Sequence, residues 1–191
     1  MYRQNYQSGI LSIFYSVGQK PLLNWASKAQ AGGIKRITDQ EIRSLVLDMR
    51  ASNITTTYIE CPAKPHETLG IRMPIFVLLF KNVNRFFSFQ IEVLDCTGFK
   101  RRFRASNFVK VTSMKQFTTS MPLVLHPGWN TVVFDLHRLL DYCYKQRLLE
   151  VNRVKIHANC RLRRVYFCDR PYSDSELPKE YKLHLMPNIG Y

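Results

Sequence analysis

Hydrophobic and polar residues alternate with a period of two along most of this chain. The alternating segments are short, rich in β-branched and aromatic residues and bounded by turn residues, which is typical of strands. They cover residues 9–17, 44–50, 55–61, 85–95 and 131–135. A further run, Pro74 to Phe80, is apolar throughout, as expected of a strand covered on both faces. Strands at this spacing, with few helices between them, predict a mainly β fold, an antiparallel β-sandwich or jelly roll.

One β-hairpin can be read directly from residues 90–107, QIEVLDCTGFKRRFRASN. Two alternating runs meet at Asp95–Gly98, where aspartate and glycine supply turn chemistry. Because side chains alternate along a strand, Lys100, Arg102 and Arg104 point to one face, and the residues between them point to the other. At least one face of this strand is therefore expected to be basic.

The clearest helix is predicted within residues 135–150, DLHRLLDYCYKQRLLE. Apolar residues recur there at steps of three and four as far as Leu148, and Asp135 stands where an N-cap is expected. Residues 37–45 fit either a helical capping box or a turn leading into a strand, and we favour the turn. The glycine pair at 32–33 is expected in a loop.

A period of two also runs through residues 153–163, RVKIHANCRLR. The even-numbered positions are apolar and the odd-numbered positions are mostly basic, so we predict one strand with a buried face and a cationic face. Such a strand would spread its cations over about 30 Å. Arg163 and Arg164 interrupt the period, which predicts a bend, bulge or turn. Residues 179–191 are expected to form a terminal strand with a short tail from about residue 186.

His157 and Cys160 could suggest a metal or thiol site within this stretch. Residues three apart face opposite sides of a strand, however, which argues against a shared metal ion. The sequence contains no CxxC pair, HExxH motif, EF-hand loop, GxSxG elbow, P-loop or dinucleotide-binding motif. We therefore expect a buried Cys160 beside an exposed His157, no metal, no cofactor and no enzymatic activity.

Length and composition predict one globular domain over residues 1–191. Of the residues, 46% are hydrophobic and 22% are charged, which is enough apolar material for a sizeable core. No run of apolar residues approaches the roughly 20 needed for a membrane-spanning helix. Residues 1–20 lack a signal-peptide core and cleavage site, so we expect a cytoplasmic protein whose five scattered cysteines are free.

The net charge of +14 indicates an acidic partner: nucleic acid, anionic lipid or an acidic protein surface such as a microtubule wall. The cations of the predicted basic strands are mostly arginine, which suits two-pronged contacts with carboxylate or phosphate. We favour an electrostatic binding face formed by Arg101, Arg102, Arg104, Lys155, Arg161, Arg163 and Arg164. Arginine by itself does not distinguish carboxylate from phosphate.

Two other binding functions compete with this interpretation. The charge and the aromatic content of 13% would also suit a nucleic-acid-binding β-module, although most aromatic residues alternate into the predicted core. Carbohydrate binding would require Trp25 or Trp129 to be exposed on a concave face. For each tryptophan we favour a place in the core.

Seven segments of the chain resemble, in order, the cilia- and flagella-associated protein 20 family. They are QSGILSIFYSVGQKPL, GGIKRITDQEIRSLVLDM, TTTYIECP, TLGIRMPIFVLLFKN, RRFRASN, GWN and VKIHANCRLRRVYFCDRPYSDSELPKEYKLHL. The resemblance runs almost from end to end. The most specific segments are RRFRASN and the run that begins at residue 154.

The resemblance implies a non-enzymatic component of axonemes and basal bodies with a β-sandwich similar to carbohydrate-binding modules. Such a protein would bind tubulin and bridge the A- and B-tubules at the inner junction of the doublet microtubule. It would lie beside the parkin co-regulated gene product and support ciliary stability and beating. His126-Pro127, Cys96, Cys168 and the short final segment depart from the family pattern. Both a broadly expressed member and a specialised one, for example in sperm flagella, fit these departures.

Overall fold

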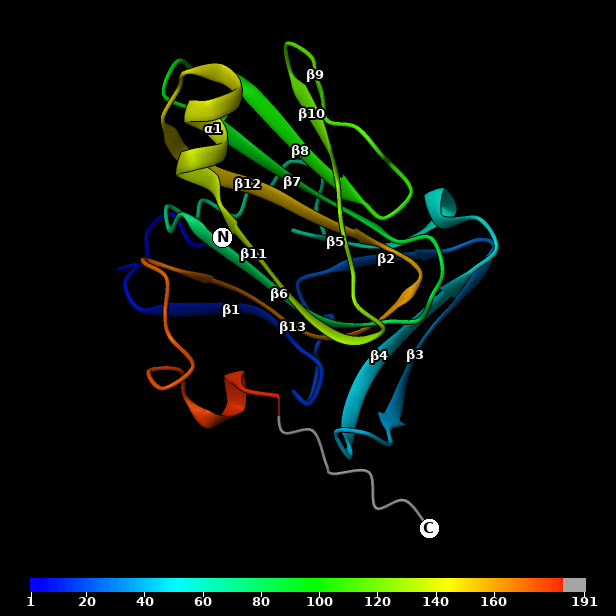
Figure 1. Ribbon diagram of the computed structural model, residues 1–191. Coiled ribbons are helices and arrows are strands. Elements are labelled where there is room, and N and C mark those ends of the chain that lie inside the picture. Colours follow the sequence, from blue (N-terminus) through cyan, green and yellow to red (C-terminus); the bar gives the residue numbers. More distant parts are fainter. Residues whose placement is uncertain (184–191) are drawn as a thin grey trace.

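Two β-sheets face each other across a hydrophobic core in the computed structural model, which describes residues 1–183 (Figure 1). The six-stranded sheet contains β1 (Ile10–Tyr15), β3 (Gly32–Asp39), β4 (Ser44–Ala51), β6 (Ile75–Asn82), β11 (Gly128–Asp135) and β13 (Cys160–Cys168). The seven-stranded sheet contains β2 (Ala26–Ala29), β5 (Thr57–Cys61), β7 (Ser88–Asp95), β8 (Lys100–Ser106), β9 (Ser113–Met114), β10 (Thr118–Pro122) and β12 (Leu148–His157). The predicted mainly β sandwich is confirmed.

Strand order places β13 at the centre of the six-stranded sheet. That sheet runs β11–β6–β13–β4–β3, and β1 pairs with the part of β13 that β4 leaves free. The other sheet runs β2–β5–β12–β7–β8–β10–β9. Neighbouring strands are antiparallel, with the exception of β8 and β10, which are parallel.

The strand β6 is covered on both faces, as its continuous apolar sequence predicts. On its inner face the Phe76 ring packs against Phe89 of β7, with 5.6 Å between ring centroids. On its outer face Val77 packs with Tyr166 beneath Tyr181. Tyr181 belongs to η2 (Lys179–Tyr181), a short 3₁₀ helix in the segment that follows β13. This part of the chain therefore covers an apolar area of the outer face.

The predicted terminal strand is not formed where the structure describes it, because Lys179–Tyr181 are helical. The rest of that prediction, and the predicted tail from residue 186, fall on residues 184–191 and lie outside the described residues.

The predicted hairpin joins β7 to β8. Gly98 has a φ of +86°, which glycine adopts without strain, and Asp95 accepts a hydrogen bond from the backbone N–H of Phe99. Along β8 the odd-numbered residues are buried and the even-numbered residues are exposed as far as residue 105. The predicted alternation of this strand is confirmed.

The helix α1 (Leu136–Tyr144) is shorter than predicted. Asp135 caps it as expected, accepting a hydrogen bond from the N–H of Arg138. The helix ends where Lys145 adopts a left-handed conformation and donates its N–H to the Asp141 carbonyl. Leu148 then begins β12. No helix within residues 1–183 is long and apolar enough to cross a membrane.

Residues 153–163 belong to two strands rather than one. β12 ends at His157 in the seven-stranded sheet, and β13 begins at Cys160 in the six-stranded sheet. The prediction of a single strand is therefore wrong. The register of β13 against β6 does shift between Leu162 and Arg164, so the predicted bulge is confirmed.

The crossing between the sheets consists of Ala158 and Asn159. Both residues are buried, and the Asn159 side chain accepts a hydrogen bond from the N–H of Ala51 at 2.7 Å and donates one to the Phe86 carbonyl at 3.1 Å. Because both sheets bury the side of the chain that faces the common core, alternation of apolar residues continues through the crossing. The sequence pattern therefore gives no sign of it.

The glycine pair at 32–33 begins β3, so the predicted loop is wrong at these positions. A methyl group on Gly32 would lie 1.8 Å from the Arg50 carbonyl oxygen, whereas one on Gly33 would meet nothing within 4 Å. The close approach of β3 to β4 therefore depends on Gly32.

Gly32→Ala is expected to lower the free energy of unfolding by about 1 to 2 kcal/mol, because the β3 backbone must move away from β4. Gly33→Ala is the matched control and should change it by less than about 0.5 kcal/mol. Urea denaturation of both variants measures the difference. Equal values for the two would contradict the steric explanation.

Candidate functional site

The seven predicted binding residues divide between the two sheets. Arg101, Arg102 and Arg104 lie on β8 and Lys155 on β12, whereas Arg161, Arg163 and Arg164 lie on β13. The chain crosses from one sheet to the other between the last two groups. The continuous basic face predicted along residues 153–163 is therefore not formed.

Arg101 points into the protein and is only 9% exposed. Its Nε donates to a carboxylate oxygen of Asp95 at 2.8 Å, and a terminal nitrogen donates to the Gln116 carbonyl. The guanidinium carbon also lies 4.5 Å from the centre of the Tyr144 ring and 5.3 Å from that of Phe99. An arginine enclosed in this way holds the fold together and has little surface left for a partner.

Arg161 belongs to an ion-pair network on the outer face of the six-stranded sheet. It lies 2.6 Å from Asp39 and 3.0 Å from Asp48, and Lys81 reaches Asp39 at 3.2 Å. Burial on its own would raise the pKa of Asp39, but the hydrogen bonds from Arg161 and Lys81 outweigh it and hold that pKa below its usual value. The charge of Arg161 is therefore neutralised within the chain.

Arg163 and Arg164 are covered by neighbouring elements. Arg163 donates to the Leu45 carbonyl at 3.0 Å, and burial lowers the pKa of its guanidinium. Arg164 is 4% exposed, and its guanidinium carbon lies 3.6 Å from the Tyr15 ring centre and 4.2 Å from that of Tyr181. The segment after β13 thus closes over Arg164.

Three of the predicted residues remain accessible on the outer face of the seven-stranded sheet. Arg102 and Arg104 are exposed, and Lys155 is partly exposed. Strand pairing places Lys155 opposite Gln90 and Gln90 opposite Arg104, so one row crosses three strands. Their partners are Glu92 for Arg102 at 3.0 Å, Gln90 for Arg104 at 2.8 Å and Glu60 for Lys155 at 3.4 Å.

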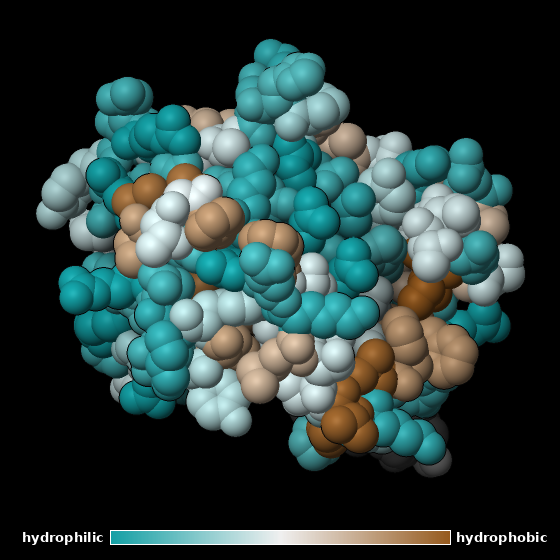
Figure 2. All heavy atoms as spheres, turned by 90° about the horizontal axis from the view of Figure 1, so that it is seen from above, coloured by the Kyte–Doolittle hydropathy of each residue, from teal (hydrophilic) through white to brown (hydrophobic). Residues whose placement is uncertain are grey.

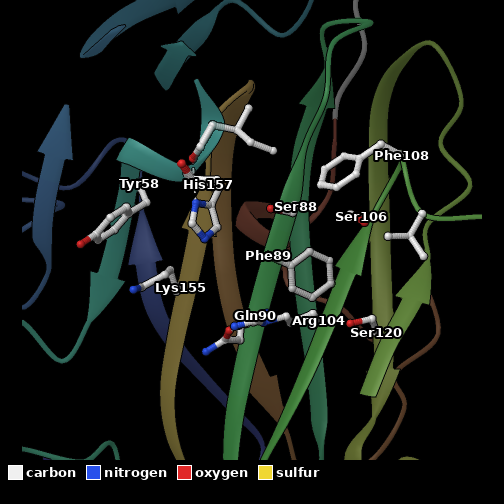
Figure 3. Close-up of a pocket in the computed structure, with 13 residues that line it drawn as sticks. Tyr58, Ser88, Phe89, Gln90, Arg104, Ser106, Phe108, Ser120, Lys155 and His157 are labelled. Atoms are coloured by element: carbon white, nitrogen blue, oxygen red, sulfur yellow. Dashed lines mark hydrogen bonds between the residues drawn. The ribbon is translucent and has the colours of Figure 1, made fainter. Parts of the chain in front are cut away.

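A cleft of about 470 Å³ opens on this face, and we call it the sheet cleft. Figure 3 shows Tyr58, Lys155 and His157 on one side of it and Phe108 and Ser120 on the other. Its lining consists of Ile54, Thr55, Tyr58, Ser88, Phe89, Gln90, Arg104, Ser106, Phe108, Val109, Ser120, Lys155 and His157. The cleft combines two cations, several hydroxyl groups and aromatic surface.

His157 is neutral in the sheet cleft at pH 7. Its Nδ1 lies 2.8 Å from the Ile54 carbonyl oxygen, which can only accept, so Nδ1 carries the proton. Burial lowers the pKa of the imidazole, and the nearby charges of Lys155 and Arg104 lower it further. Nε2 is then left as a hydrogen-bond acceptor.

His157 and Cys160 are separated as predicted. Cys160 is fully buried in the core, and burial raises the pKa of its thiol. His157 is half-buried rather than exposed, because it packs against Tyr58 with 5.5 Å between ring centroids. Within residues 1–183 there is no group of three or more histidine, cysteine, aspartate or glutamate residues placed to hold a metal ion.

Neither tryptophan forms an exposed platform on the seven-stranded sheet. Trp25 is 5% exposed and donates its indole N–H to the Ile13 carbonyl at 2.9 Å, so its predicted place in the core is confirmed. Trp129 lies on β11 of the other sheet, is half-buried and does not belong to the hydrophobic core, so its predicted place in the core is wrong. The seven-stranded sheet therefore offers no exposed tryptophan to a carbohydrate within residues 1–183.

Sequence reasoning missed most of the sheet cleft. Alternation shows that Ser88 and Gln90 share a face of β7, but it does not reveal that β12 lies beside them. Phe108 follows β8 in a loop, where no periodic pattern predicts the direction of a side chain. Tyr58 could have been found only if the pairing of β5 with β12 were known.

Comparisons with known proteins agree along nearly the whole chain. A sequence model of the CFA20 domain matches residues 1–185. The protein named "Cilia- and flagella-associated protein 20" from Chlamydomonas reinhardtii is 49% identical over 97% of this chain and 97% of its own length. The proteins of the same name from Caenorhabditis elegans and Paramecium tetraurelia are each 48% identical over 97% of this chain, and the matches cover 91% and 97% of those proteins.

Solved structures that align with the chain include two of a family 11 carbohydrate-binding module from Clostridium thermocellum. Both are 10% identical in sequence, with TM-scores of 0.41 and 0.43. The alignments cover 85% and 88% of this chain and 97% and 99% of those chains.

Proposed function

The chain belongs to the CFA20-domain family of cilia- and flagella-associated proteins, and from this we propose that it is a structural microtubule-associated protein of the axoneme. In this role it bridges the A- and B-tubules at the inner junction of the doublet and supports axoneme stability and motility. Its partners there are tubulin and the parkin co-regulated gene product. It acts by binding, without catalysis.

The observation that carries this proposal is the extent of the family match. Residues 1–185 match the domain, and the match to the Chlamydomonas relative covers 97% of both chains. A chain that matches the family over this length is therefore expected to have the same role. The net charge of +14 supports an acidic partner such as tubulin.

A protein that bridges two filaments needs two separate surfaces. The outer face of the seven-stranded sheet offers Arg102, Arg104 and Lys155. The hairpin of β3 and β4, which lies at the lower right of Figure 1, carries exposed Lys35 and Arg36 on the other sheet. Each exposed ion pair contributes less than about 1 kcal/mol, so stable attachment depends on contacts repeated along the filament.

We retain Arg102, Arg104 and Lys155 as tubulin-binding residues. Arg101, Arg161, Arg163 and Arg164 were part of the same prediction, but each is held by partners within the chain. Substituting any of those four should lower the free energy of unfolding more than it weakens binding to tubulin.

The double variant Arg102→Glu and Arg104→Glu is expected to bind doublet microtubules roughly tenfold more weakly than the unchanged protein. Both side chains are exposed, so folding should persist. The matched control is Arg72→Glu with Arg138→Glu, which changes the net charge equally at exposed positions elsewhere. Co-sedimentation at two salt concentrations measures both variants.

Equal binding by the two double variants would contradict the assignment of this face to tubulin. The proposed function itself is tested by the location of the tagged protein in a ciliated cell. Signal along the axoneme supports it, and signal confined to the nucleus would overturn it in favour of nucleic-acid binding.

A further inference from the structure

The sheet cleft attracts anions. Its two cations, Arg104 and Lys155, face no aspartate or glutamate among the described residues that line it. The closest carboxylates lie just outside: Glu60 pairs with Lys155 at 3.4 Å, and Glu92 pairs with Arg102 at 3.0 Å. Lys155 is thus partly neutralised, and Arg104 is the stronger anchor for a negative group.

Arg104 is oriented for a two-pronged contact. Its Nε donates to the side-chain oxygen of Gln90 at 2.8 Å, which fixes the plane of the guanidinium. Its two terminal nitrogens have no hydrogen-bond partner within residues 1–183. Two parallel N–H groups of this kind match the two oxygens of a carboxylate.

The cleft continues into an exposed hydrophobic area, which we call the apolar rim and define as Phe86, Phe108, Val109 and Val124. The Phe86 and Phe108 rings meet with centroids 5.3 Å apart, and these side chains are 66% and 43% exposed. Val109 lines both the cleft and an adjoining hollow that includes Val124, which is 88% exposed. In Figure 2, hydrophobic side chains gather at the lower right of the surface. Clustered exposed apolar residues mark interaction sites.

We propose that the sheet cleft and the apolar rim together bind a short, extended acidic peptide segment. A glutamate or aspartate carboxylate of the segment contacts Arg104 and Lys155, and an apolar side chain beside it packs on Phe86 and Phe108. This inference rests on the proposed function, in which an acidic filament protein supplies the segment.

The chemistry of the site favours a peptide over a nucleic acid. One well-oriented arginine and one partly neutralised lysine suit one or two carboxylates, whereas a nucleic acid presents a regular row of phosphates. The rim includes the aliphatic residues Val109 and Val124, which suit an aliphatic or aromatic side chain of a peptide. Because the cations and the apolar rim lie side by side, the peptide segment needs an acidic residue next to an apolar one.

Fluorescence polarisation with a labelled glutamate-rich peptide carrying one phenylalanine tests the proposal on the full chain. Arg104→Gln should weaken binding roughly tenfold, and Phe108→Ser should weaken it several-fold. Arg72→Gln makes the same chemical change at an exposed position outside the cleft and should leave the affinity within about twofold. The same peptide with glutamine in place of glutamate should bind no better than the Arg104→Gln variant binds the original.

Equal affinity of Arg104→Gln and the unchanged protein would overturn the proposal, as would tight binding of the glutamine peptide. Tighter binding of a single-stranded oligonucleotide, lost in the same variant, would overturn the choice of peptide. Co-sedimentation of the unchanged chain with doublets distinguishes failure of the peptide-binding inference from failure of the proposed function. If doublets are bound while the peptide results fail, only this inference falls. If doublets are not bound, the proposed function falls and the peptide results judge the cleft alone.

Discussion

Replacing Asp95 by alanine is expected to lower the free energy of unfolding by about 3 to 5 kcal/mol. Asp95 is fully buried, and its carboxylate accepts hydrogen bonds from the Arg101 side chain, from the Thr97 hydroxyl and backbone N–H, and from the Phe99 N–H. Without the Asp95 carboxylate, the hairpin turn loses the hydrogen bonds that hold Thr97 and Phe99. Arg101 would also remain buried with no opposing charge.

Thermal and urea denaturation measure this effect. The control is Glu67→Ala, which removes the exposed partner of Lys64 and should cost less than about 1 kcal/mol. A loss below 1 kcal/mol for Asp95→Ala would mean that Arg101 finds water or another partner, contrary to its enclosure between aromatic rings.

Asp39→Asn is expected to lower the free energy of unfolding at pH 7 by about 2 to 3 kcal/mol. Asparagine keeps the shape of the side chain but leaves Arg161 and Lys81 without their shared charge. Because the folded-state pKa of Asp39 lies below its unfolded value, its stabilisation is complete above the unfolded pKa of about 4 and is lost as pH falls through the folded pKa. The difference in free energy of unfolding between the unchanged protein and Asp39→Asn should therefore become smaller in acid.

Urea denaturation at a series of pH values from neutral to acidic measures this narrowing. Glu67→Gln breaks the exposed pair with Lys64 and serves as control, with an expected cost below 1 kcal/mol at every pH. A gap for Asp39→Asn that stays constant between pH 7 and strongly acidic solution would contradict the role of the carboxylate charge.

Those parts of the fold that depend only on residues close together in the sequence could be predicted. The β7–β8 hairpin follows from alternation and from Asp95 and Gly98 at the turn. The start of α1 follows from Asp135, whereas its end depends on Lys145, whose left-handed conformation no residue type demands. The crossing at Ala158 was hidden because its burial continues the strand pattern.

For the candidate site, the sequence predicts which face of a strand a residue lies on, but not which residues come together. Alternation correctly separated Arg102 and Arg104 from Arg101, but the prediction that all three belong to a binding face was wrong for Arg101, which is buried. Whether a cation is neutralised depends on partners far away in sequence, such as Asp39 for Arg161. A cleft formed by five strands and their loops needs their pairing order, which local patterns do not contain.

The central position of β13 has a consequence for the order in which the protein can be made. Three strands synthesised early, β1, β4 and β6, all pair with β13, which ends at residue 168. During translation the six-stranded sheet therefore lacks its middle until most of the chain has been synthesised, and contacts between distant residues form slowly. The segment that covers Val77 and Tyr166 comes later still. A nascent chain stalled before residue 160 would leave one edge and the outer face of the apolar β6 uncovered and should depend on chaperones.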